Sequence, residues 1–153
     1  MPSPVYPFTA FSFAVEIYRD QDSKPLVEAA FAECDGLEMT HDIKTIRQGG
    51  DNARQWRLNG AVSFGQLSLK RGITGDFALW KWFQDSIADP RLRAGAEVVL
   101  LAPDGVSERM RFQLTRCVPV KVKAPQLAAK DGQIAIEELQ VAYETLQLAL
   151  PAN

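Results

Sequence analysis

The stretch IAIEELQVAYETLQLAL, residues 134–150, alternates apolar and polar side chains in three blocks that differ in phase. Alternation with a period of two is typical of a strand with one buried face. A single unbroken strand of this length would span ~55 Å, about three times an ordinary strand. We therefore expect the stretch to bend at two points, or to bury opposite faces against different neighbours. A helix is the rival interpretation, because Glu, Leu, Gln and Ala are good helix formers.

Strand patterns also dominate the rest of the chain. A glycine at position 65 falls where the alternation shifts by one, which indicates a β-bulge, and Pro119 indicates an edge or a bulge because proline cannot donate to a ladder. The predicted strands are 11–17, 27–34, 37–45, 61–70, 97–102, 110–114 and 118–122. Together these patterns predict a mostly antiparallel β fold with one short helix, in a single domain of residues 1–153.

The one predicted helix, 76–88, is unusually apolar. Asp76 is a good N-cap and Thr74 is its rival. A surface helix normally carries one apolar stripe, but here two sets of apolar residues cover more than one side: Phe77, Trp80, Phe83 and Ile87 on one face, with Leu79 and Trp82 beside them. We expect the surplus aromatic surface to meet a partner, or else a loop to cover it.

A long loop is predicted over residues 47–60, RQGGDNARQWRLNG, because it is rich in glycine, asparagine and arginine. Loops of this length without their own secondary structure are usually functional or mobile. Its arginines could touch nucleic acid, but the chain's formal net charge of −2 argues against high affinity. Solvated ion pairs, or ion pairs between subunits, are the default interpretation.

Neither a signal peptide nor an apolar run of membrane-spanning length is visible, so we expect the protein to be made in the cytoplasm. Two cysteines and one histidine are too few for a structural zinc site. The turn at 71–76, RGITGD, matches no phosphate-binding motif, and Asp76 places a carboxylate where an anion would sit. A dyad of Cys34 and His41 is conceivable but has no evident orienting group. We expect no catalytic residue, no metal and no cofactor.

Five stretches together resemble the inner tail-tube proteins of contractile-tailed phages and related contractile injection systems. They occur in the expected order and cover about residues 7–148. They are PFTAFSFAVEI, FAECDGLEM, RQGGDNARQWRLNG, LKRGITGDFALWKW and VPVKVKAPQLAAKDGQIAIEELQVAYETL.

The resemblance implies an antiparallel β-barrel or sandwich of the tail-tube type, with an N-terminal arm at 1–8 and a flanking helix. Six copies would form a ring with one continuous barrel, and rings would stack into a hollow tube inside a contractile sheath. Implied partners are the sheath protein, baseplate and tube-initiating or capping proteins, and cargo in the lumen, with no specific nucleic-acid sequence. The subunit contacts we expect are Arg47, Asp51, Asn52, Arg54 and Trp56 in the loop, with Trp80, Trp82 and Phe83 on the helix.

Two departures from the family pattern leave the exact role open. Residues 124–127, APQL, lack a Gly-Pro pair, and residues 58–60, LNG, lack an expected proline. A variant tube protein or a baseplate-adaptor protein is therefore an alternative to the bulk tube subunit. A small-ligand-binding β-barrel, or an enzyme using Cys34 and His41, is the alternative from a different class. The family also implies assembly in the bacterial cytoplasm, into a particle that is released, membrane-bound or part of a virion.

Overall fold

The computed structural model describes residues 12–19, 27–29, 31–47, 49–50, 53–72, 77–127, 129 and 135–149. Within these ranges the chain forms antiparallel strands and one helix, which confirms the mainly β prediction. The elements are β1 (Phe13–Arg19), β2 (Val27–Ala29), β3 (Glu33–Asp35), β4 (Met39–Arg47), β5 (Gln55–Phe64), β6 (Gln66–Gly72), α1 (Ala78–Ala88), β7 (Ala94–Leu101), β8 (Glu108–Lys123), β9 (Ile136–Ala142) and β10 (Thr145–Ala149).

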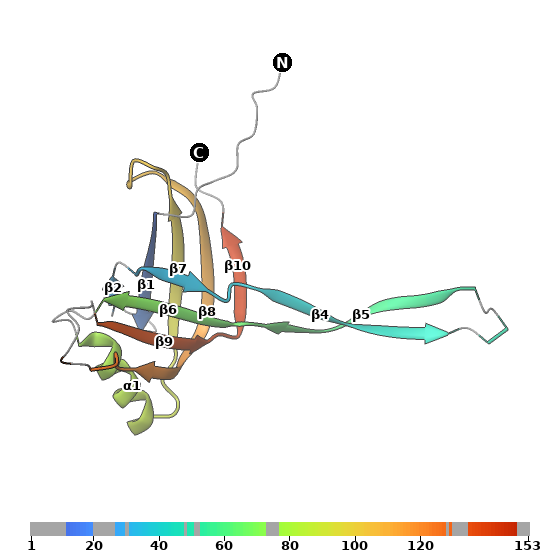
Figure 1. The fold of residues 1–153 in the computed structure, drawn as a ribbon. Helices are drawn as coiled ribbons and strands as arrows, with labels where there is room; N and C mark the ends of the chain where they lie inside the picture. Colours follow the sequence, from blue (N-terminus) through green and yellow to red (C-terminus); the bar gives the residue numbers. More distant parts are fainter. Residues whose placement is uncertain are drawn as a thin grey trace, which may run out of the picture.

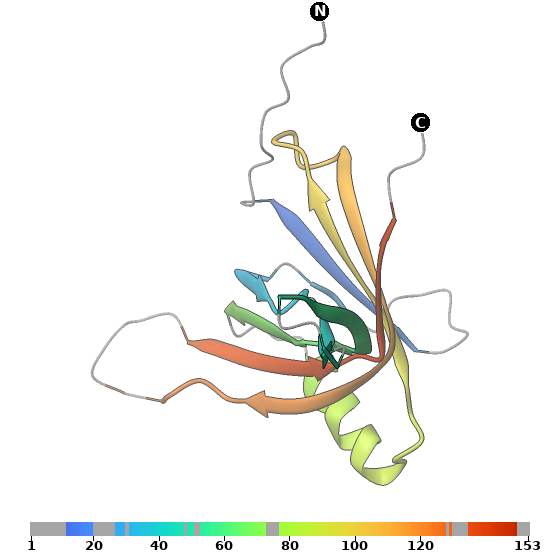
Figure 2. The same ribbon diagram turned by 90° about the vertical axis from the view of Figure 1, so that its right-hand side faces the viewer.

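Strand β8 belongs to two sheets that pack against each other (Figures 1 and 2). Its first part pairs with β7 and β10, and β7 leads on to β1 and β2; we call this the first sheet. Its last part pairs with β9, which leads on to β6 and β3; we call this the second sheet. Strands β4 and β5 form a separate hairpin.

The C-terminal stretch is strand, as expected, and in the described residues it bends once, between β9 and β10. β9 pairs with β6 and β8, whereas β10 pairs with β8 in the first sheet. Strand β8 bends opposite this point, where Arg116 has a φ of 51°. The backbone N–H of Glu144 donates to Thr115 O at 3.0 Å, and Arg116 Nε lies 2.9 Å from Glu144 Oε2. The bulge predicted at Pro119 is confirmed by the register shift that follows it.

The core lies between the two sheets and is closed at one end by α1. Its largest fully buried side chains are Trp82, Ile17, Leu67, Leu69, Leu79, Leu114, Leu139, Val15 and Val141. Leu79 and Trp82 are thus the face of α1 that packs inward, while Phe77 and Ile87 are 71% and 68% exposed. The helix is preceded by Phe77 at the N-cap position, which supplies no side-chain cap. The predicted caps Asp76 and Thr74 lie outside the described residues.

An ion pair, Arg71–Glu137, is buried where α1 meets the second sheet. The two residues lie opposite each other on β6 and β9, and each is 3% exposed. Arg71 Nε donates to the Glu137 carboxylate, and Trp80 Nε1 of α1 donates to Glu137 Oε2 at 3.3 Å. The Arg71 guanidinium also lies over the Phe31 ring, 5.7 Å from its centroid. One carboxylate therefore ties α1 to two strands.

We expect Glu137→Gln to lower the free energy of unfolding by about 3 kcal/mol or more, because it removes the carboxylate that lies against a buried guanidinium. Urea unfolding followed by tryptophan fluorescence measures this. Glu144→Gln is the matched control: it removes the same charge from a pair that is 57% exposed at both side chains, and should cost below about 1 kcal/mol. Equal small effects would mean that the buried pair does not stabilise the fold.

Candidate functional site

The β4–β5 hairpin projects far from the body of the molecule (Figure 1). It replaces most of the loop predicted at 47–60, because β5 already begins at Gln55. The prediction missed the alternation of Trp56 and Leu58, which pair with Ile46 and Lys44 on β4. Of the described residues of that loop, only Gly49, Gly50, Ala53 and Arg54 lie outside the two strands. Every residue of β4 is exposed, so the hairpin rests on little of its own subunit.

The outer part of this hairpin is amphipathic. Ile46, Trp56 and Leu58 share one face and are each about half exposed. The opposite face is mostly polar and carries Thr45, Arg47, Gln55, Arg57 and Asn59, with Ile43. Apolar side chains at this exposure on one face of a two-stranded ribbon indicate a surface that binds a partner.

Nearer the body, a β-bulge interrupts the hairpin. The register shifts between His41 and Ile43, so that Gly60 and Ala61 together oppose Asp42. A side chain at Gly60 would bring its Cβ within 2.8 Å of the Asp42 carbonyl oxygen, which explains the glycine. Between the bulge and the body, the apolar residues Met39, Val62 and Phe64 lie on the opposite face from Trp56 and Leu58.

Tyr143, at the bend between β9 and β10, holds the root of the hairpin. Its hydroxyl donates to Gly36 O at 2.7 Å and accepts from the backbone N–H of Glu38 at 3.3 Å. Its ring packs on Phe64, with 5.9 Å between centroids. Gly65, where a bulge was predicted, separates β5 from β6, and its N–H donates to Glu38 O at 3.2 Å. The hairpin is therefore anchored to the bend that joins the two sheets.

The contact residues predicted in the hairpin lie at its outer end, as far as the structure describes them. Arg47 ends β4 opposite Gln55. The Arg54 guanidinium lies over the Trp56 ring, 5.6 Å from its centroid, which keeps the exposed indole beside a positive charge. Asp51 and Asn52 lie outside the described residues. Ile46 and Leu58 were missed, although their alternation with Trp56 was readable.

The contact residues predicted on the helix do not behave alike. Trp82 is 2% exposed and packs in the core, so it is not part of a contact surface in this fold. Trp80 is half-buried and bonded to Glu137, and Phe83 is half-buried. The exposed apolar side chains of α1 are Phe77 and Ile87, which the sequence alone did not separate from the core face.

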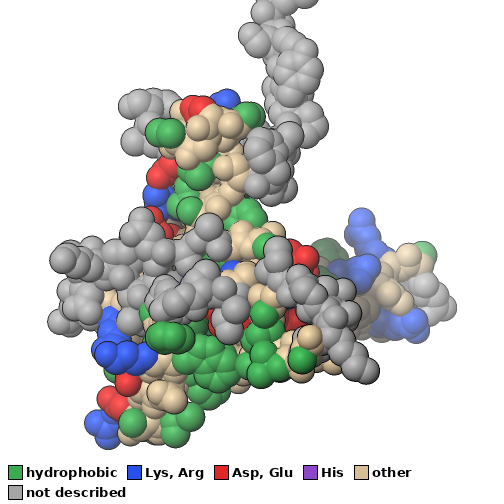
Figure 3. All heavy atoms as spheres, turned by 60° about the vertical axis from the view of Figure 1, so that its left-hand side comes forward, with side chains coloured by type: hydrophobic (Ala, Val, Ile, Leu, Met, Phe, Trp, Pro, Cys, Tyr) green, Lys and Arg blue, Asp and Glu red, His purple; other side chains and the backbone are tan. Residues whose placement is uncertain are grey.

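The helix and the hairpin tip lie on different sides of the molecule (Figure 1). Hydrophobic side chains gather on the lower part of the body, whereas Lys and Arg side chains gather on the receding hairpin (Figure 3). The structure therefore does not bring the two predicted sets of residues into one site. It presents two separate surfaces.

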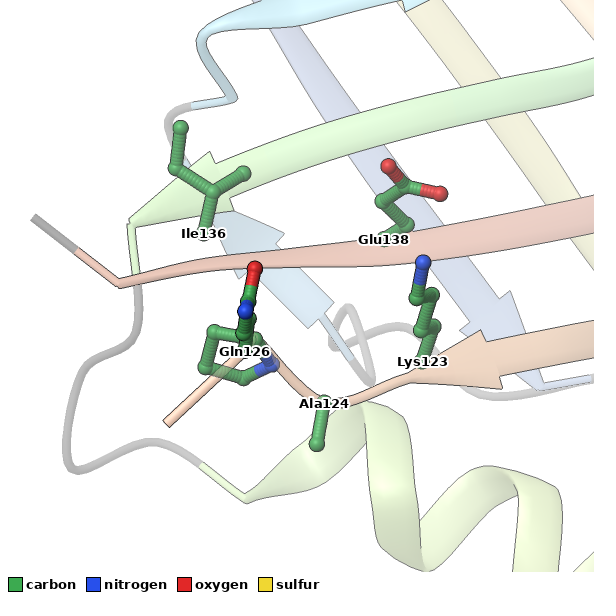
Figure 4. Close-up of a pocket in the computed structure, with 6 residues that line it drawn as sticks. Lys123, Ala124, Gln126, Ile136 and Glu138 are labelled. Carbon is green, nitrogen blue, oxygen red and sulfur yellow. The ribbon is translucent and has the colours of Figure 1, made fainter. Parts of the chain in front are cut away.

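An open groove of about 410 Å³ lies where β8 and β9 diverge (Figure 4). It is lined by Lys123, Ala124, Pro125, Gln126, Ile136 and Glu138. Lys123 and Glu138 extend from neighbouring strands, but Lys70 Nζ also lies 3.8 Å from Glu138 Oε1. Glu138 therefore belongs to a surface ion-pair network, and the described lining residues of the groove include no nucleophile with its base.

Cys34 and His41 occupy different environments. Cys34 lines an apolar pocket, together with Phe13, Leu37, Val98, Leu100 and Phe112, while His41 is exposed on the hairpin opposite Val62. Burial raises the pKa of the Cys34 thiol to about 11, the opposite of an activated thiolate. Within the described ranges, no group of acidic, histidine and cysteine side chains is suited to a metal ion. No helix among those residues is long and apolar enough to span a membrane.

We expect Cys34 in the folded protein to react with iodoacetamide at pH 8 about 100-fold more slowly than in the urea-unfolded chain, because its raised pKa lowers the thiolate fraction. Peptide mass spectrometry distinguishes it from Cys117, which is fully buried. Equal rates in the two states would show an accessible, reactive thiolate and revive the Cys34–His41 alternative.

Comparisons with known proteins agree with this geometry. A chain of the anti-feeding prophage baseplate has a TM-score of 0.80 at 24% identity and covers 97% of each chain. A chain of the PVC sheath-tube complex in the extended state has a TM-score of 0.80 at 20% sequence identity, and the match covers 95% of this chain and 93% of that one. A chain of the PVC sheath/tube terminator has a TM-score of 0.82 at 19% sequence identity, and the match covers 96% of this chain and 99% of that one. No curated protein matches significantly.

The family model described as T4-like virus tail tube protein gp19 matches residues 9–147, which is most of the chain. The resemblance noted in the sequence is thereby confirmed. The members of this family are structural proteins, so the expectation that the chain is no enzyme is confirmed with it. The chain belongs to the T4-like virus tail tube protein family and is a tail tube protein of a phage or contractile injection system.

Proposed function

We propose that this protein assembles into six-membered rings that stack into the hollow inner tube of a contractile particle. The tube is driven through the target envelope when a surrounding sheath contracts, and its lumen carries cargo. The subunit works by assembly alone and needs no cofactor. The six-fold ring and the surrounding sheath are inferred from the family resemblance. The contacts between subunits are inferred from the exposed surfaces of this chain.

The β4–β5 hairpin is the observation that carries the proposal. It holds half-exposed Ile46, Trp56 and Leu58 on one face, away from the body. An isolated two-stranded hairpin is marginally stable in water, and contiguous exposed apolar surface marks an interface. A neighbouring subunit that covers this face would remove it from water and fix the hairpin in place. Arg47, Asp51, Asn52 and Arg54 at its outer end would then supply polar contacts around Trp56.

The ends of the first sheet support a barrel shared between subunits. Among the described strands, β10 pairs only with β8 and β2 pairs only with β1, so each presents an outer edge. Residues 145–149, TLQLA, contain none of the prolines or charges that protect edge strands. Pairing the edge of one copy with that of the next would satisfy these backbone groups and make one continuous barrel.

Surfaces on different sides of one subunit suit a ring. When one patch binds a different patch on the next copy, the contact is heterologous and closes if the rotation allows. The hairpin is one such patch. The exposed side of α1, with Phe77 and Ile87 beside half-buried Trp80 and Phe83, is a second. We infer that both contact other copies of the chain.

The remaining partners follow from the same proposal: sheath protein outside, baseplate and tube-initiating or capping proteins at the ends, and no specific nucleic-acid sequence inside. Assembly takes place in the bacterial cytoplasm, and the particle is released, membrane-bound or part of a virion. Structural relatives include chains from a baseplate, a cap and a terminator. A variant tube or baseplate-adaptor role is therefore the second candidate.

The hairpin surface predicts a defect in assembly without a defect in folding. We expect Trp56→Ala combined with Leu58→Ala to abolish rings and tubes in negative-stain electron microscopy over a concentration series. The midpoint of thermal unfolding of the monomer should stay within a few degrees, because neither side chain is in the core. The matched control is Thr45→Ala with Asn59→Ala on the opposite face, which should assemble as wild type does.

Normal tubes from the Trp56/Leu58 variant would overturn the hairpin assignment. Wild-type protein that stays monomeric at every concentration is next mixed with preformed baseplate. Polymerisation then indicates templated assembly, and continued failure overturns the tube proposal itself.

A further inference from the structure

The inner face of the first sheet extends past the second sheet that covers it (Figures 1 and 2). Strand register places Val15, Val98 and Leu114 on this face, and all three are buried. Further along the strands the same face is only partly covered. Its residues there, which we call the apolar strip, are Phe13, Leu100, Met110, Phe112 and Leu148.

A pocket of about 190 Å³ opens beside this strip. Its lining is apolar and comes from both sheets and the segment that joins β3 to β4: Phe13, Cys34, Leu37, Val98, Leu100 and Phe112. An apolar cavity of ~150 Å³ suffices for a benzene molecule. The pocket therefore has room for one aromatic ring.

The rim of this pocket carries acidic side chains. Asp35 and Glu38 directly follow the lining residues Cys34 and Leu37, and both are exposed. The Asp35 carboxylate is close enough to act on the thiol: burial raises the pKa of Cys34, and Asp35 raises it further. A group that brings an apolar ring together with a positive charge would therefore match the pocket and its rim.

The outer part of the β4–β5 hairpin has this complementary composition. Its described residues, 43–47 and 53–59, include no acidic residue and several basic ones: Lys44, Arg47, Arg54 and Arg57. Figure 3 shows these charges gathered on the hairpin. The Arg54 guanidinium lies over the ring of half-exposed Trp56. The hairpin therefore presents an aromatic ring and a cation side by side.

A subunit's own hairpin points away from its own pocket. Leu37, which lines the pocket, precedes the start of β4 by two residues. From there β4 runs for nine residues away from the body (Figure 1), and a strand of that length spans ~30 Å. Trp56 pairs with Ile46 near the outer end. The two complementary surfaces can therefore meet only between copies of the chain, as a heterologous contact.

We propose that the outer end of the hairpin of one copy lies on the apolar strip of another copy, with the Trp56 ring in the pocket and Arg54 beside Asp35. Ile46 and Leu58, on the same hairpin face as Trp56, would cover the strip. This inference rests on the proposed function for the identity of the occupant, a second copy, and adds the surface that receives it. Each copy would receive a hairpin beside the point from which its own hairpin departs.

Cys34 allows a direct test, because it lines the pocket. Trp56→Cys is mixed as a minor component with wild-type protein, so that wild-type hairpins hold the tubes together. Under mild oxidation we expect the introduced thiol to form an interchain disulfide with Cys34, roughly tenfold faster than the thiol of the matched control Thr45→Cys on the opposite hairpin face. Tandem mass spectrometry of sedimented tubes identifies the cross-linked peptides.

The outcomes separate this inference from the proposed function. Tubes in which the two variants react with Cys34 at equal rates, or in which neither reacts, would overturn the placement in the pocket and leave the tube proposal intact. Wild-type protein that never assembles, even with preformed baseplate, would overturn both. Cys34→Ala in the wild-type component should abolish the cross-link, and a cross-link that persists would also overturn the placement.

Charge reversal tests the acidic rim independently. Asp35→Lys should raise the concentration at which rings appear about tenfold, because it sets like charges against each other. Adding Arg54→Glu to the same chain should restore assembly to within about threefold of wild type. Arg57→Glu, on the opposite hairpin face, is the matched control and should not restore it. The midpoint of thermal unfolding checks that each variant is folded. Equal rescue by both changes, or rescue by neither, overturns the proposal.

Discussion

The fold depends on one bend made by two paired strands. Strand β8 and the C-terminal segment run antiparallel along each other, and both turn where Arg116 and Glu144 face one another. β8 stays hydrogen-bonded to the C-terminal segment on both sides of the bend, to β10 in the first sheet and to β9 in the second. The core therefore lies between the two halves of one bent strand pair. The positive φ of Arg116 costs on the order of 1 kcal/mol. The core that closes behind the bend, with Leu114, Cys117, Leu139 and Val141, offsets this cost.

Much of this architecture was readable from the sequence because it rests on local alternation. Residues 134–150 indicated strand over helix, and the changes of phase indicated a change of neighbours, which the bend at Tyr143 provides. The single bend, instead of two, depends on which strand lies opposite, and alternation within one strand carries no such information. Gly60 shows the same limit. A glycine reads as a loop residue, whereas its structural reason is the close approach of Asp42 across the hairpin.

The candidate surfaces were predictable in part. Trp56 and Arg54 were expected as contact residues from the family resemblance of their loop, and the structure places them together at the hairpin's outer end. Assigning the faces of α1 required the tertiary structure. A helix with aromatic residues on more than one side gives no sign of which aromatic faces the sheets, so Trp82 and Trp80 could not be told apart until the core and Glu137 were in view. The buried Arg71–Glu137 pair was also missed, because a charge on an apolar strand phase looks like a solvent-facing residue until its partner is known.

The bulge at Gly60 gives the hairpin two working sides. Below the bulge its apolar residues, Met39, Val62 and Phe64, face one way, and beyond it Ile46, Trp56 and Leu58 face the other. In the proposed assembly, a ribbon with one apolar face near its base and the opposite face apolar near its tip would contact a different neighbour on each face. In a stacked assembly, a subunit next to the base and another next to the tip would both be engaged by the same two strands. Tension along the tube would then be shared across adjacent layers through continuous backbone, and pulling one layer away would mean stripping the ribbon from both bodies at once.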